Sequence, residues 1–233
     1  MDILRKIPIS ELAYQRIKDA ILACELKPGQ LIVQGDLADQ HNIGITPVRE
    51  ALRQLSQEGF VQAVPRLGYQ VSQITNHDVE EIFEMRLILE SQSARMTATR
   101  APLDVIKNIC NQADFTYTYK KKESYLEFLH GNALFHSTIA AASGNQRLAE
   151  QVTRILDELN RVFHLGLDVR DSAEEMRNDH LKFAKALMNR DPDKAEEIVR
   201  DEIQRSHIRV KEAIQHYQNQ NSATVFIHPV TNF

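Results

Sequence analysis

The sequence predicts a mainly helical protein of two domains, with a small β-hairpin in the first domain. Apolar residues recur at helical spacing through most of the 233 residues. Alternation typical of strands is confined to residues 60–64 and 69–71. The length suits two small domains, which we expect at residues 1–74 and 75–218, with a tail over residues 219–233.

The stretch from Thr46 to Gly59 predicts a short helix with two distinct faces. We expect Thr46 to cap its start, Pro47 to fit its first turn and Gly59 to end it. Arg49 and Arg53 are four residues apart and should point outward together. The opposite, buried face consists of Val48, Ala51, Leu52 and Leu55. A helix with one apolar and one paired-arginine face fits the DNA major groove.

The neighbouring segments predict two preceding helices and a following hairpin. The first helix should bury Leu12, Ile17, Ile21 and Leu22. The expected elements are a helix from Leu12 to Leu22, a turn at 27–29, a helix from Gln34 to His41 that buries Leu37 and Ala38, and strands at 60–64 and 69–71. This order describes a winged helix-turn-helix with Arg66 at the tip of the wing.

The remainder of the chain predicts a six-helix antiparallel bundle. The expected helices begin near Asn76 and Pro102 and then cover residues 123–142, 145–165, 173–188 and 192–217. No strand pattern and no internal repeat interrupts them.

Composition and charge indicate a cytoplasmic protein. The chain has no apolar run long enough to span a membrane, no signal peptide, and only Cys24 and Cys110, which we expect as free thiols. The net charge is −4, and residues 1–74 hold eight Lys/Arg and eight Asp/Glu. DNA affinity then needs a local basic patch and two copies of it, so we expect a homodimer on a two-fold site.

The segment "LKPGQLIVQGDLADQHNIGITPVREALRQLSQEGFVQAVPRLGYQV" resembles the DNA-binding domain of GntR-family bacterial transcription regulators. The resemblance implies a double-stranded DNA operator. Thr46, Arg49, Arg66 and Gly68 stand in the matching motifs, and Arg53 is more consistent with a phosphate or surface role. Ile45 stands where the family usually has an arginine, so the operator should differ from those read by the fuller arginine set.

The second half resembles the FCD effector-binding domain of the FadR subfamily. The similar segments are "EMRLILESQSARMTA", "NALFHSTIAAASGN" and "NDHLKFAKALMNRDPDKAEEIVRDE". Six helices suit the VanR-like branch. Family members build a metal site from one Asp and three His, which corresponds here to Asn132, His136, His180 and Glu202.

Two of those four positions depart from the family pattern. Asn132 replaces the aspartate, and Glu202 stands where the third histidine is usual. Two imidazoles and a carboxylate still suit a divalent ion such as zinc, nickel or manganese, with Asn132 as a weak fourth ligand. The alternative is that His136 and His180 are core histidines of a polar cavity without metal.

The effector implied by the resemblance is a small organic acid. Arg86 corresponds to the family's cavity arginine, and a guanidinium suits a carboxylate; the alternative is an ion pair with Glu90 one turn later. Asn132, His136 and His180 are the other candidate effector contacts, together with Asn160 or its neighbour Arg161 on the fourth helix of the bundle.

We therefore expect an effector-responsive transcription regulator, such as a repressor, rather than an enzyme. Catalysis around His136, His180 and Glu202 would lack a separate general base or nucleophile, and would leave the winged helix unexplained. The remaining alternative is an effector-independent DNA-binding protein with a vestigial ligand cavity.

Overall fold

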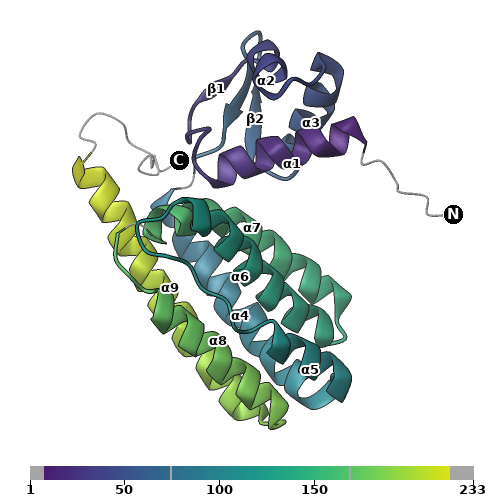
Figure 1. The fold of residues 1–233 in the computed structure, drawn as a ribbon, viewed down its shortest axis with the longest axis vertical. Coiled ribbons are helices and arrows are strands. Elements are labelled where there is room, and N and C mark those ends of the chain that lie inside the picture. The colour runs from purple at the N-terminus through teal and green to yellow at the C-terminus, as the bar shows by residue number, and fades with distance from the viewer. Residues whose placement is uncertain (1–7, 74, 168, 221–233) are drawn as a thin grey trace, which may run out of the picture. The chain divides into compact units, whose positions relative to one another are not determined.

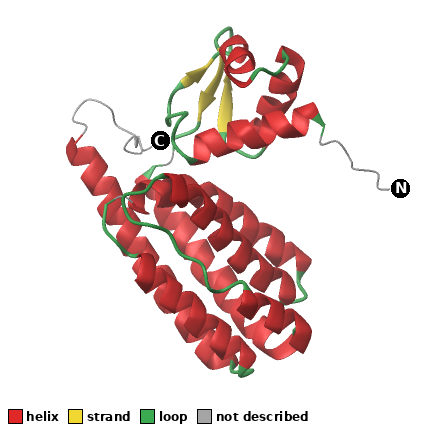
Figure 2. Ribbon diagram, viewed as in Figure 1, coloured by secondary structure: helices red, strands yellow, loops and turns green. Residues whose placement is uncertain are grey.

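A computed structural model describes residues 8–73, 75–167 and 169–220 (Figure 1). Contacts divide the chain into a first unit that ends at Thr75 and a second unit that begins at Asn76. Within the described residues, strands occur only in the first unit (Figure 2). None of the described helices is both long and apolar enough to cross a membrane.

The first unit is a winged helix-turn-helix, as the sequence predicted. Its elements are α1 (Ile9–Leu22), β1 (Leu31–Ile32), α2 (Gln34–His41), α3 (Ile45–Gln57), β2 (Val61–Val64) and β3 (Gly68–Val71). The predicted hairpin is part of a three-stranded antiparallel sheet in the order β1-β3-β2. The sequence analysis missed β1, because a strand of two residues has no measurable alternation.

Helix α3 begins two residues earlier than predicted, at Ile45. Gly44 occupies the N-cap position in an extended conformation, so the expectation that Thr46 caps the helix is wrong. Thr46 is the second helical residue and is exposed. The predicted stop is confirmed: Gly59 has φ +85°, and the amide of Phe60 donates to the carbonyl of Leu55 at 2.9 Å.

The core of the first unit matches the predicted apolar faces with one exception. In α1, Leu12 is 37% exposed, and Ala13 is buried in its place, so the assignment of Leu12 to the core is wrong. Ala13 is fully buried in α1, which packs against α3. The remaining predicted core residues are buried: Ile17, Ile21, Leu22, Leu37, Ala38, Val48, Ala51, Leu52 and Leu55.

The second unit contains the six predicted helices, counted over the described residues. They are α4 (Asn76–Arg100), α5 (Leu103–Asn111), α6 (Glu123–Ala142), α7 (Gln146–Leu167), α8 (Ala173–Met188) and α9 (Pro192–Gln220). Helix α4 packs along α9, and α6 packs along α7 (Figure 1). Helix α9 continues to Gln220, so the first residues of the predicted tail are helical, and residues 221–233 lie outside the described residues.

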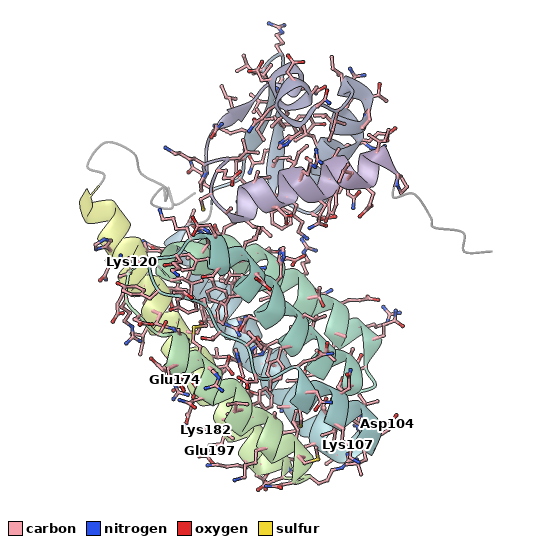
Figure 3. All side chains as sticks on the ribbon, in the orientation of Figure 1. Asp104, Lys107, Lys120, Glu174, Lys182 and Glu197 are labelled. Atoms are coloured by element: carbon pink, nitrogen blue, oxygen red, sulfur yellow. The ribbon has the colours of Figure 1, made fainter. Side chains whose placement is uncertain are left out.

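Exposed charged side chains cover the outside of this bundle. Lys107, Lys182 and Glu197 point away from the helices that carry them (Figure 3). Arg86, in contrast, is only 2% exposed and is one of the largest fully buried side chains. Because a charged group rarely enters a helical core without partners, the surroundings of Arg86 mark the candidate site.

Candidate DNA interface and buried metal centre

The outward face of α3 carries the predicted DNA-contacting residues. Thr46, Arg49 and Arg53 are all exposed. The Nε atom of Arg49 donates to Oε1 of Gln34, at the start of α2, over 3.3 Å. This contact uses Nε of the guanidinium and leaves the two terminal nitrogens of Arg49 as donors for another acceptor.

The wing places an arginine at its tip and a glycine where the strands meet. Arg66 is exposed and has φ +67°, a left-handed conformation between β2 and β3. Gly68 has φ +107°, and a Cβ atom there would lie 2.8 Å from the carbonyl oxygen of Ile32. The geometry gives Gly68 a structural role, because it allows β1 to approach β3 closely.

The second unit holds a continuous chain of buried charged side chains. The Nε atom of Arg86 donates to Oε1 of Glu90 at 2.6 Å. The other carboxylate oxygen of Glu90 is 2.8 Å from Nδ1 of His136. Nε2 of His136 is 3.0 Å from Oε1 of Glu202, and the same oxygen is 3.6 Å from Nε2 of His180. Four helices, α4, α6, α8 and α9, therefore meet at one buried polar cluster.

The neighbouring charges in this cluster shift the pKa values of His136, Glu202 and Glu90. Burial alone lowers the pKa of His136, but the carboxylates of Glu202 and Glu90 outweigh burial and raise it to about 9. Burial opposes ionisation of Glu202, yet His136 and His180 hold its pKa well below the ordinary value. Burial likewise opposes ionisation of Glu90, but Arg86 and His136 lower its pKa. At neutral pH, two cations, Arg86 and protonated His136, thus face two carboxylates.

The donor set of the cluster suits a divalent metal ion. His136, His180 and Glu202 each offer one ligand atom, and these atoms lie within 4.8 Å of one another. Among the described residues, no hydrogen bond reaches either ring nitrogen of His180, Oε2 of Glu202 or Nη1 of Arg86. Buried polar atoms without partners are rare, and an ion or ligand is one of the few things that satisfies them. Two imidazoles and a carboxylate are suitable ligands for zinc.

The two amide residues predicted for the site are also buried. Asn132 is one turn before His136 on α6 and faces inward with it. Asn160, on α7, has a side-chain oxygen that accepts no hydrogen bond from the described part of the chain. The roles of both residues in the site stay predictions.

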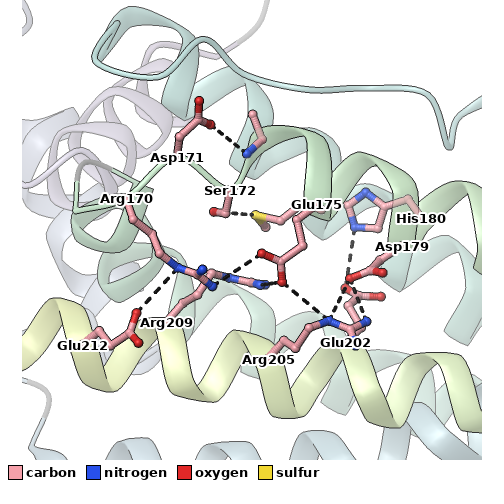
Figure 4. Close-up of polar contacts among 12 residues, drawn as sticks. Arg170, Asp171, Ser172, Glu175, Asp179, His180, Glu202, Arg205, Arg209 and Glu212 are labelled. Carbon is pink, nitrogen blue, oxygen red and sulfur yellow. Dashed lines mark hydrogen bonds and ion pairs between the residues drawn. The ribbon is translucent and has the colours of Figure 1, made fainter.

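A second network of ion pairs connects α8 to α9 beside the cluster (Figure 4). Nη1 of Arg209 donates to Oε1 of Glu175 at 3.0 Å, and Nη2 of Arg205 donates to Oδ2 of Asp179 at 2.8 Å. Arg170 also approaches Glu175, at 3.5 Å. Because α8 carries His180 and α9 carries Glu202, this network holds the helices that bear two of the candidate ligands.

Sequence reasoning missed the central position of Glu90. The sequence predicts Glu90 only as an ion-pair partner of Arg86, and the structure shows that pair together with a contact between Glu90 and His136. The spacing of four residues between Arg86 and Glu90 revealed the pair. Their common contact with α6 depends on tertiary packing and has no signal in the sequence.

The comparisons with known proteins agree with this architecture. The FCD domain model matches residues 81–205, and the model of bacterial regulatory proteins of the gntR family matches residues 9–71. The chain therefore belongs to the GntR-family transcription regulators with an FCD domain, the FadR-like subfamily. Its members are DNA-binding regulators rather than enzymes.

Relatives and solved structures match most of the chain. The HTH-type transcriptional repressor RspR of Escherichia coli K12 is 23% identical over 218 residues, which is 92% of each chain. The repressor GlaR of the same organism is 23% identical over 198 residues, or 82% of this chain and 90% of GlaR. The structure of E. coli McbR/YncC has a TM-score of 0.71 at 20% identity and covers 91% of this chain and all of that one, which supports the fold alone.

Proposed function

We propose that this DNA-binding regulator is a homodimeric repressor that a small organic acid controls through a divalent metal ion. Residues 1–74 form its DNA-binding domain and residues 75–218 its effector-binding domain, in the cytoplasm. Two E. coli relatives have the word repressor in their names, which supports the sign of regulation. Six described helices in the second unit support assignment to the VanR-like branch.

The observation that carries the effector proposal is the buried His136–Glu202–His180 group next to Arg86. A divalent ion held by His136, His180 and Glu202 would supply a Lewis-acid centre for an anionic ligand. Glu90 would accept from Nδ1 of His136 and so fix the ring with Nε2 toward the ligand group. Asn132 and Asn160 are proposed as further polar contacts of the effector.

Charge balance supports an anion as the effector. Without metal, the positive charges of Arg86 and His136 match the negative charges of Glu90 and Glu202. Exchange of the His136 proton for a divalent ion leaves one net positive charge. Because Nη1 of Arg86 makes no hydrogen bond with the described residues, it can take one oxygen of a carboxylate.

The effector acts on DNA binding only if it binds one arrangement of the dimer more tightly than another. We propose that these arrangements differ in the placement of the two winged helices. Arg49 is the proposed reader of a guanine, Thr46 and Arg53 lie beside it on α3, and Arg66 contacts the phosphate backbone or minor groove from the wing.

The metal half of the proposal is tested by zinc titration calorimetry in buffers of different ionisation enthalpy. Because His136 must lose its proton, zinc binding near pH 7.5 should release close to one proton. The double variant His136→Ala/His180→Ala should bind no zinc, whereas His77→Ala, an exposed histidine of α4, should bind it normally. Unchanged zinc binding by the double variant would refute the site.

The effector half is tested by DNA binding with zinc and a panel of small organic acids. We expect at least one acid to weaken operator binding by the wild type, and Arg86→Ala to require far more of it. A metal-loaded protein whose DNA binding no acid changes would favour the alternative, an effector-independent DNA-binding protein with a vestigial cavity.

A further inference from the structure

An exposed isoleucine occupies the first position of the recognition helix. Ile45 begins α3 directly after the extended Gly44 and is 50% exposed. Its side chain is therefore not part of the core that Val48, Ala51 and Leu52 form on the other face of α3. The exposed side chain of Ile45 is accessible to a partner of this helix and would gain free energy from apolar contact with it.

Ile45 shares one face of α3 with the two arginines. Ile45, Arg49 and Arg53 follow one another at intervals of four residues, and all three are exposed. This face lies opposite the buried residues Val48, Ala51 and Leu52 of α3. Whatever Arg49 contacts on DNA, Ile45 therefore reaches a point one helical turn nearer the start of α3.

The major groove offers one prominent apolar group, the 5-methyl group of thymine. We propose that Ile45 recognises a thymine methyl group in the operator, beside the base pair that Arg49 contacts. One helical turn rises about 5.4 Å and one base pair about 3.4 Å, so the thymine lies about one or two base pairs from the Arg49 contact. This inference rests on the proposed entry of α3 into the major groove.

Replacement of thymine by uracil tests the contact directly, because uracil lacks only the methyl group. A binding duplex is first recovered by in vitro selection from a random DNA pool with the full-length protein. Each thymine is then replaced by deoxyuridine, one position at a time. At one position in each half-site, wild-type affinity should fall about fourfold, the value for one buried methyl or methylene group.

The variant Ile45→Ala should bind the thymine duplex about as weakly as the wild type binds the uracil duplex. The affinity of Ile45→Ala should fall little further when uracil replaces the contacted thymine. A matched control is Leu103→Ala, since Leu103 is also the first residue of a helix and is 49% exposed, but lies in the second unit. The affinity of Leu103→Ala for DNA should fall about fourfold on uracil replacement, as in the wild type.

Two results would overturn the inference. The first is that replacing thymine by uracil weakens DNA binding equally in Ile45→Ala and in the wild type. The second is that this replacement weakens wild-type binding at no position of the duplex. The parallel variant Arg49→Ala separates this failure from failure of the proposed function. If Arg49→Ala binds the selected duplex normally, α3 is not the recognition helix; if it loses binding while uracil has no effect, only the role of Ile45 is wrong.

Discussion

At the scale of single residues, two glycines of the first unit should respond in opposite ways to alanine. In Gly68→Ala, the added Cβ would lie 2.8 Å from the Ile32 carbonyl oxygen at φ +107°, so we expect a loss of about 1–2 kcal/mol in unfolding free energy. Gly35 lies in α2 with open space around its Cα, and Gly35→Ala should stabilise by about 0.5–1 kcal/mol. Urea unfolding of both variants checks this; equal effects would contradict the close approach of β1.

Gln34 is a second residue whose role a substitution can isolate. Because its Oε1 atom accepts from Nε of Arg49, Gln34→Ala should release the arginine and reduce its discrimination between base pairs several-fold. The measurement compares binding to the selected duplex and to duplexes mutated at each guanine. Gln40→Ala, an exposed glutamine on the same helix, serves as the control and should keep wild-type discrimination.

At the scale of elements, the wing should contribute charge rather than sequence preference. Arg66 has φ +67°, so Arg66→Asn is a better probe than alanine, because asparagine tolerates this conformation. We expect the variant to weaken binding to all DNA sequences about equally and to lower the salt slope by about one. A changed sequence preference at an unchanged slope would show that Arg66 reads bases.

The contacts between α4, α6 and α9 should make the stability of the metal-free protein depend on pH. His136 has a folded-state pKa of about 9, above its unfolded value of 6.5. Its charge contributes stability that is complete below about pH 6.5 and disappears as pH rises through 9. The difference in urea midpoint between the wild type and His136→Asn should shrink over that range.

This comparison requires chelator-treated protein, because a bound metal would remove the proton. His77→Asn, at an exposed position of α4, should show no comparable trend. A constant difference between wild type and His136→Asn from pH 6 to pH 10 would show that His136 is not held as a cation between Glu90 and Glu202.

At the scale of the whole molecule, DNA binding should require two copies of the chain. One winged helix offers a small surface, and residues 1–74 carry no net charge. We therefore expect a homodimer on a roughly palindromic site, with half-sites spaced by about one helical turn of DNA. Sedimentation velocity at micromolar concentration, with and without the selected duplex, measures this; a monomer in both conditions would rule out the two-fold model.

The sequence by itself determined most of the secondary structure and the class of protein. Periodicity marked α2, α6 and α8 at the residues where the structure has them, because each has a regular apolar face and a clear stop. The ordered DNA-binding motifs and the bundle motifs identified the family. The start of α3 was misplaced at Thr46, since an extended Gly44 can precede a helix without a capping side chain.

Only the tertiary structure decided which charged residues meet. Glu90, His136, His180 and Glu202 come from four helices, and their distances depend on how those helices pack. Periodicity shows that a residue faces inward but not which residue it faces. The arrangement of α6, α8 and α9 likewise brings Glu202 into contact with both histidines. The close approach of β1 to Gly68 also depends on tertiary structure, because the two segments are far apart in the sequence.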